Sequence, residues 1–172
     1  MQDAQTESPD RLRRIIAVGF LSWLTMLGVD FLIHGGLLAS LYAQTSPFLL
    51  PPLDAFHKIP IGYLSFLFLA VLLLWPMLRI GISGWREGLL FGLKLGLLTW
   101  GALLLGLISI STAPANLMIG WWVGQSVELG IAGAVAGYGL RAERLRFLVL
   151  GVIGVVIVSV LITVILQNIS FG

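Results

Sequence analysis

Long runs of apolar residues alternate along the chain with short charged segments. Four stretches carry no charged residue at all: 31–53, 59–78, 95–127 and 147–172. A helix needs about 20 apolar residues to cross a hydrocarbon core of about 30 Å. Because lipid offers the backbone no hydrogen bonds, each such run is expected to be helical. The runs do not alternate with a period of two, which argues against an outer-membrane barrel. The pattern predicts an all-α membrane helix bundle.

The runs divide into five predicted transmembrane helices. The uncharged stretch 95–127 is too long for one crossing, and a polar turn with a proline divides it at 111–116. The predicted spans cover about 15–42, 59–78, 87–110, 117–140 and 147–167. One long kinked helix across that turn would instead give four spans. The predicted organisation is a polar cytoplasmic tail over 1–14, followed by a single transmembrane domain over 15–168.

Two segments are expected to depart from straight helix. The first span is roughly 42 Å long at about 1.5 Å per residue, so it must tilt, protrude or bend, and Gly35-Gly36 is the natural place for a bend. The segment 46–60 contains four prolines, which predicts an irregular external loop that lies against the membrane interface. The span 147–167 is rich in β-branched residues and uncharged, which predicts a lipid-facing or partner-facing helix without chemistry of its own.

Composition supports a membrane protein and excludes several other classes. The chain has 172 residues, of which 58% are hydrophobic and 10% charged, whereas about 25% charged is usual in soluble domains. The absence of cysteine excludes a disulfide scaffold and thiolate chemistry. A net charge of +2, with the basic residues beside the apolar runs, argues against nucleic-acid binding. The lipid bilayer is therefore the first expected partner.

The basic residues predict an orientation. With the N-terminus inside, all eight arginines fall on the cytoplasmic side, and Lys58 alone falls on the other side. This positive-inside bias places the N-terminus in the cytoplasm and, with five crossings, the C-terminus outside. The expected location is a bacterial-type inner membrane. The arginines are Arg11, Arg13, Arg14, Arg79, Arg86, Arg141, Arg144 and Arg146.

Glycines at four-residue spacing predict close helix packing. Such spacing puts small residues on one stripe of a helix and lets two backbones approach. The stripes are Gly88, Gly92 and Gly96 in the third span, with Gly120, Gly124, Gly133 and Gly137 in the fourth. The packing partner is another helix of the same chain or another protein.

Ionisable residues inside the spans are the main chemical signal. Asp30 and His34 are one helical turn apart, and Gln125 and Glu128 share a face of the fourth span opposite its later glycines. Lys94 likewise lies opposite the glycines of the third span, so the polar faces of the first, third and fourth spans are expected to converge. There Lys94 would neutralise Asp30 or Glu128. Buried charges usually pair or mark ion pathways.

Three interpretations of this intramembrane cluster stay open. It is a structural clamp that fixes helix register, a proton or ion relay or polar ligand site, or a set of contacts completed by another subunit. No catalytic or metal motif is present, so neither an enzyme nor a metal site is predicted. No cofactor is predicted either, although a pigment or haem bound through His34 is not excluded.

Part of the chain resembles known membrane families. The resembling pieces are Val29-Asp30-Phe31-Leu32, the glycine-rich segment 88–101 and the tryptophan-led segment 121–133. They resemble small polytopic bacterial integral membrane proteins that belong to families of unknown function. The resemblance covers about 20–140 and leaves the fifth span outside. It implies no activity, because those families have none assigned.

The sequence thus favours a small structural or accessory membrane protein that acts within a larger complex or as a homo-oligomer. The alternative is a transporter of a small solute, proton or ion that uses the intramembrane cluster. A pigment-binding or haem-binding subunit is a weaker alternative.

Overall fold

The computed structural model describes residues 9–44 and 47–171. In this part of the chain all regular structure is helical, which confirms the predicted all-α class. The helices are α1 (Pro9–Leu32), the π-helical turn η1 (Ile33–Leu37), α2 (Ala39–Tyr42), α3 (Pro52–Ile80), α4 (Trp85–Ile110), α5 (Ala115–Arg141) and α6 (Arg146–Phe171). The predicted tail over 1–14 lies outside the described residues up to position 8, and its remainder begins α1.

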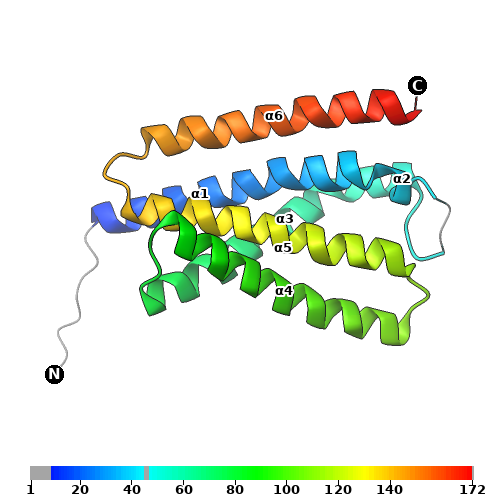
Figure 1. Ribbon diagram of the computed structural model, residues 1–172, viewed down its shortest axis with the longest axis horizontal. Helices are drawn as coiled ribbons and strands as arrows, with labels where there is room; N and C mark the ends of the chain where they lie inside the picture. The colour runs from blue at the N-terminus through cyan, green and yellow to red at the C-terminus, as the bar shows by residue number, and fades with distance from the viewer. Residues whose placement is uncertain (1–8, 45–46, 172) are drawn as a thin grey trace.

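The long helices lie side by side, and each runs opposite to the long helix before it in the chain, so that the neighbours α1 and α6 are parallel (Figure 1). α4, α5, α1 and α6 follow one another across the bundle, and α3 crosses behind α1 and α5 (Figure 1). α1, α4 and α6 begin at the end of the bundle where α3 and α5 finish (Figure 1). The arginine-bearing segments therefore all come to one end of the molecule.

Within the described residues, four helices are long and apolar enough to cross a membrane: Pro9–Leu37, Leu53–Ile80, Trp85–Ile110 and Arg146–Ile169. This is one fewer than the five predicted spans. α5 has 27 residues, but Gln125, Glu128 and many glycines interrupt its apolar stretches. α5 is also the helix with the most buried positions, because it packs along both α4 and α1. The polar residues of α5 are tolerated because the helix lies in the centre of the bundle.

The α4–α5 interface is built on glycine. Gly88, Gly92 and Gly96 all face α5, and a Cβ atom at Gly92 would collide with the carbonyl of Leu129. A Cβ at Gly133 would in turn collide with the carbonyl of Gly88, and Gly137 lies against Gly84. The two backbones touch directly, and the Gly84 N–H donates to the Gly137 carbonyl at 2.8 Å. Only glycine permits this approach.

Gly120 and Gly124 face the end of the first span rather than α4. A Cβ at Gly120 would meet Leu38, and one at Gly124 would meet Ile33 and His34. These two glycines therefore let the π-helical end of the first span approach α5. The glycines of α5 divide into one group for α4 and another for the first span.

The first span changes its geometry where the paired glycines lie. Gly35 and Gly36 fall inside η1, and Leu38 then separates η1 from the short α2. A π turn holds one extra residue, so carbonyls at its edges lose their usual partners. α6 contacts this region: Gln167 donates to the Gly35 carbonyl at 2.8 Å. The Thr163 hydroxyl lies 3.2 Å from the Phe31 carbonyl and 2.8 Å from the Ser159 carbonyl of α6 itself. These contacts attach α6 to the first span, while most of its apolar side chains, such as Leu150, Leu161 and Ile165, are exposed, as expected of a lipid-facing or partner-facing helix.

The predicted proline-rich loop is shorter than expected. α3 begins at Pro52, so the segment 52–60 is helical and the prediction of an irregular loop there is wrong. A proline in the first turn needs no N–H, and Pro60 in the helix interior removes only one backbone bond. Residues 45–46 lie outside the described residues.

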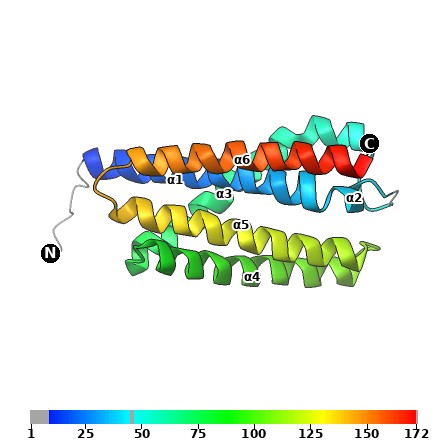
Figure 2. The same cartoon turned by 45° about the horizontal axis from the view of Figure 1, so that its top comes forward.

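The first half of α3 stands away from the other helices. Most of its side chains up to position 65 are exposed, including Phe56, Ile61 and Leu64. In Figure 2 this part of α3 rises above α1 and α6 near the C-terminus. The second half packs into the core through Leu73 and Met77, which are fully buried. α3 thus opens a space at the end of the bundle opposite the arginines.

Candidate ligand site

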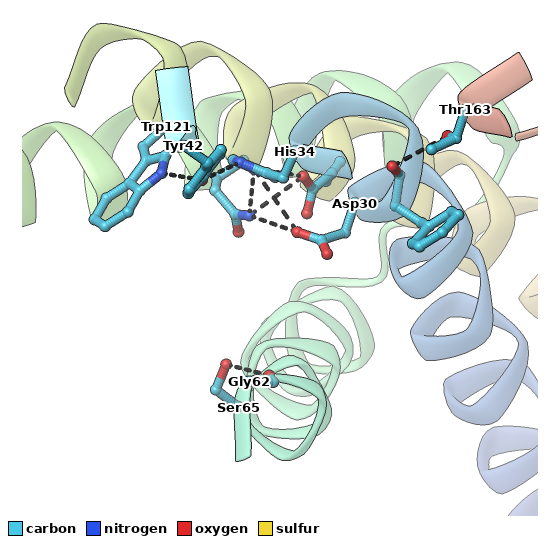
Figure 3. Close-up of polar contacts among 10 residues, drawn as sticks. Asp30, His34, Tyr42, Gly62, Ser65, Trp121 and Thr163 are labelled. Atoms are coloured by element: carbon cyan, nitrogen blue, oxygen red, sulfur yellow. Dashed lines mark hydrogen bonds and ion pairs between the residues drawn. The ribbon is translucent and has the colours of Figure 1, made fainter. Parts of the chain in front are cut away.

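Four polar side chains from two helices meet where the first span lies against α5 (Figure 3). His34 Nε2 lies 3.3 Å from Glu128 Oε1 and 3.7 Å from Asp30 Oδ1. The amide nitrogen of Gln125 lies 3.1 Å from His34 Nε2, 3.2 Å from Glu128 Oε1 and 3.5 Å from Asp30 Oδ1. We call Asp30, His34, Gln125 and Glu128 the polar cluster.

Helical spacing explains why these residues come together. Asp30 and His34 are four apart, and Gln125 and Glu128 are three apart, so each pair projects from one face of its helix. Gly124 beside them has no side chain, which lets the imidazole of His34 reach α5. The face of α5 that carries the pair is opposite the one that packs on α4.

Two aromatic residues position His34. Its Nδ1 forms a hydrogen bond of 2.7 Å with the Tyr42 hydroxyl. The indole N–H of Trp121 donates to the same hydroxyl oxygen. This chain of contacts fixes the ring, so that Nε2 points at the two carboxylates.

The members of the polar cluster differ in exposure. The side chain of Glu128 is 0% exposed, whereas those of His34 and Asp30 are 13% and 20% exposed. Glu128 is therefore the inner carboxylate, and Asp30 borders the open space described above. The site has a closed side on α5 and an accessible side at Asp30.

The polar cluster does not satisfy its own hydrogen-bonding needs. The Gln125 amide nitrogen has two hydrogens but three acceptors within 3.5 Å. Gln125 Oε1 and Glu128 Oε2 are buried and have no hydrogen-bond partner among the described residues. Most buried polar atoms in folded proteins are paired, so two unpaired acceptors beside a carboxylate require an explanation.

A cavity of about 620 Å³ borders the polar cluster. It lies between the first half of α3 and the helices that carry the cluster. Its wall includes Asp30, His34, Gln125, Tyr63, Trp100 and Trp121. Aromatic rings thus surround a polar floor, which is the usual composition of a small-molecule or ion-access site.

Lys94 does not join the polar cluster. Its side chain is exposed on α4, and no ion pair is found for it in the described part of the chain. α4 turns its glycine stripe towards α5 and has few other neighbours. The opposite face, which carries Lys94, therefore points out of the bundle. The predicted neutralisation of Asp30 or Glu128 by Lys94 is wrong.

Tyr42 is the site residue that sequence reasoning missed. In an unbroken helix Leu41, seven residues after His34, would share its face. The π turn inserts one residue, so Tyr42 takes that place instead. The paired glycines at 35 and 36 are the one sequence signal of this shift.

The side chains around His34 leave no room for a haem or pigment ring beside its nitrogens. Nδ1 contacts Tyr42, and Nε2 faces Glu128, Asp30 and Gln125. A haem iron would have to displace one of these contacts. His57, the second histidine of the chain, is exposed and packs edge-on against Phe56.

No family model, curated protein or solved structure matches the chain. The resemblance to small bacterial membrane families therefore stays a prediction.

Proposed function

We propose that this chain is a membrane protein that binds a small inorganic cation, the proton included, at the polar cluster and passes it across the bilayer. The observation that carries this proposal is the pair of carboxylates beside an imidazole, with Glu128 fully buried and Asp30 at the edge of a cavity. Two like charges at this depth favour a positively charged occupant.

The proposed arrangement has five crossings, with the N-terminus in the cytoplasm and the C-terminus outside. α5 has 27 residues, and at about 1.5 Å per residue it is long enough to cross. Its polar side chains face α1 rather than the lipid, which is how a crossing helix tolerates them. The gathering of the arginines at one end fits the positive-inside pattern of an inner membrane.

The polar atoms favour a binding site over a structural clamp. A clamp stabilises a bundle when each of its buried donors and acceptors is paired. Here the innermost carboxylate keeps an unpaired oxygen, and the neighbouring amide has an unpaired oxygen as well. A site that binds a cation would need these same atoms free.

The accessory role that the sequence favours stays an alternative. It rests on the small size of the chain, the glycine packing faces and the absence of a catalytic motif. The convergence of four polar side chains instead favours a binding site. An accessory subunit, within a larger complex or in a homo-oligomer, predicts that the purified chain alone neither binds nor transports cations.

Flux measurements in liposomes test the proposal. Purified protein is reconstituted into vesicles loaded with a pH-sensitive dye or a metal-sensitive dye, and ion gradients are imposed. We expect flux in the wild type and at least a tenfold loss in Asp30→Asn and Glu128→Gln. Asp54→Asn, an exposed carboxylate on α3, is the matched control and should retain full flux. Equal flux in all four proteins, or none in the wild type, would overturn the proposal.

A further inference from the structure

We infer that the polar cluster is a four-ligand site for a divalent transition-metal ion, with Zn²⁺ as the best fit. The ligands are Asp30, His34, Gln125 and Glu128. This inference rests on the proposed function in one respect, since it takes the cation of that site to be a metal.

The separations of the donor atoms match a metal site. Zinc bound at about 2.0–2.2 Å by four tetrahedral ligands keeps those ligands roughly 3.3–3.6 Å apart. His34 Nε2 lies 3.3 Å from Glu128 Oε1 and 3.7 Å from Asp30 Oδ1. One ligand atom from each of these three residues lies within 4.8 Å of the other two. The three atoms are therefore close enough to surround one ion.

The Gln125 amide supplies the fourth corner. Its nitrogen lies between 3.1 and 3.5 Å from the other three ligand atoms, where it faces more acceptors than it has hydrogens. A half turn about the last bond of the side chain exchanges this nitrogen with Oε1, which has no hydrogen-bond partner among the residues that the structure describes. The amide oxygen then points at the ion, as carboxamide oxygens do in metal sites.

The buried inner carboxylate points independently to a ligand. Glu128 is fully buried, its Oε1 points at His34, and its Oε2 has no hydrogen-bond partner in the described part of the chain. A dication bound there would balance the charges of Glu128 and Asp30. Its attraction would replace the hydration that the buried carboxylate has lost.

The surroundings of His34 are those of a metal ligand. A histidine that binds a metal by Nε2 usually donates the hydrogen on Nδ1 to an outer partner, which fixes the ring. Tyr42 is that partner at 2.7 Å, and Trp121 fixes Tyr42 in turn. Tyr42 is therefore a positioning residue rather than a ligand.

The ligand set selects among cations. Ca²⁺ and Mg²⁺ prefer six or more oxygen ligands, whereas Zn²⁺ accepts four that include imidazole. Both carboxylates and the amide also suit Co²⁺, which makes Co²⁺ a spectroscopic probe of the same site.

Metal uptake by the purified full-length protein in detergent tests the inference. After treatment with a chelator and its removal, the protein is titrated with ZnCl₂ by calorimetry and with CoCl₂ by absorption. We expect one Zn²⁺ per chain, the intense visible bands of four-coordinate Co²⁺, and no displacement by excess Mg²⁺. No uptake by the wild type would overturn the inference, as would weak bands typical of six-coordinate Co²⁺.

Variants then assign the ligands. Asp30→Asn, His34→Asn and Glu128→Gln should each weaken Zn²⁺ binding at least tenfold, and Tyr42→Phe should weaken it while keeping the Co²⁺ bands. Asp54→Asn and His57→Asn, which change the same residue types on exposed positions of α3, should bind as the wild type does. Binding that survives in all three ligand variants would overturn the assignment.

The outcome separates this inference from the proposed function. Stoichiometric Zn²⁺ uptake without flux would mean a resident metal, so the inference would hold and the transport proposal would fail. Proton flux without metal uptake would support the transport proposal and overturn the metal-site inference. If a ligand variant does not fold, the Co²⁺ spectrum of the wild type still tests whether a four-coordinate metal site is present.

Discussion

The two sides of α5 differ in how they pack against their neighbours. On the side towards α4, Gly133 and Gly137 bring the backbone of α5 against that of α4. The side towards the first span carries Gln125 and Glu128, whose buried acceptors are only partly paired. One interface is complete in itself, whereas the other leaves polar atoms available for a cation.

The difference shows how a small bundle combines rigidity with a ligand site. Close backbone packing on one side fixes α5 and so fixes the position of Glu128. Unpaired polar atoms reduce stability, and functional sites commonly retain them at that expense. The first two predictions below test the two sides of α5 separately, and the others test contacts around them.

Alanine at Gly92 should have the largest effect. The new Cβ would collide with the backbone of Leu129, and backbone cannot move aside as a side chain can. We expect the protein to lose about 3 kcal/mol or more of stability, or to fail to assemble. Thermal unfolding in detergent measures this loss.

Gly106→Ala is the matched control on the same helix, since a Cβ there meets no atom within 4 Å. It should leave the unfolding temperature unchanged or slightly raised. Equal losses in the two variants would mean that the α4–α5 contact does not depend on backbone approach.

Removal of the Tyr42 hydroxyl group should weaken Zn²⁺ binding at the polar cluster without unfolding the protein. Tyr42→Phe deletes the partner of His34 Nδ1 and leaves the ring in place. Outer partners of metal-binding histidines typically contribute about 10–100-fold in affinity, so we expect a loss of that size in Zn²⁺ binding. Calorimetry measures the affinity, and an unchanged unfolding temperature would exclude general damage.

The contact between α1 and α3 should contribute a smaller amount. The Trp23 indole N–H donates to the Tyr63 carbonyl at 3.0 Å, next to the cavity. Trp23→Phe keeps an aromatic ring and removes this bond, so a loss of about 1 kcal/mol is expected. Thermal unfolding again provides the measurement, and a loss of several kcal/mol would show a larger role for the tryptophan.

Lys94→Met should have the smallest effect. Its side chain is exposed on the outer face of α4 and does not neutralise the polar cluster. Cation binding and stability should both match the wild type. A large fall in binding would mean that Lys94 reaches the cluster after all.

Helices and faces were predictable, because they follow from local spacing. The gaps between charges predict the long helices, and the three-residue and four-residue spacings place Asp30 with His34 and Gln125 with Glu128. The same reasoning failed for Lys94, since it assumed that α4 is surrounded by other helices. Which neighbours a helix has is a tertiary property, and its own periodicity does not reveal it.

The start of α3 and the role of Tyr42 depend on backbone details that residue patterns leave open. Prolines at 51, 52 and 60 argue against helix in general, but the first turn of a helix tolerates proline and a long helix survives one interior proline. The π turn at Gly35 and Gly36 changes the register by one residue. Only the backbone itself shows that Tyr42, rather than Leu41, reaches His34.

The most direct test of the account is the unfolding temperature of Glu128→Gln in detergent without added metal, measured beside that of the wild type. If the polar cluster is a cation site, the loss of a buried charge should leave this temperature unchanged or raise it. If the cluster is instead a clamp that fixes helix register, the same variant should unfold several degrees lower. That result would contradict the account.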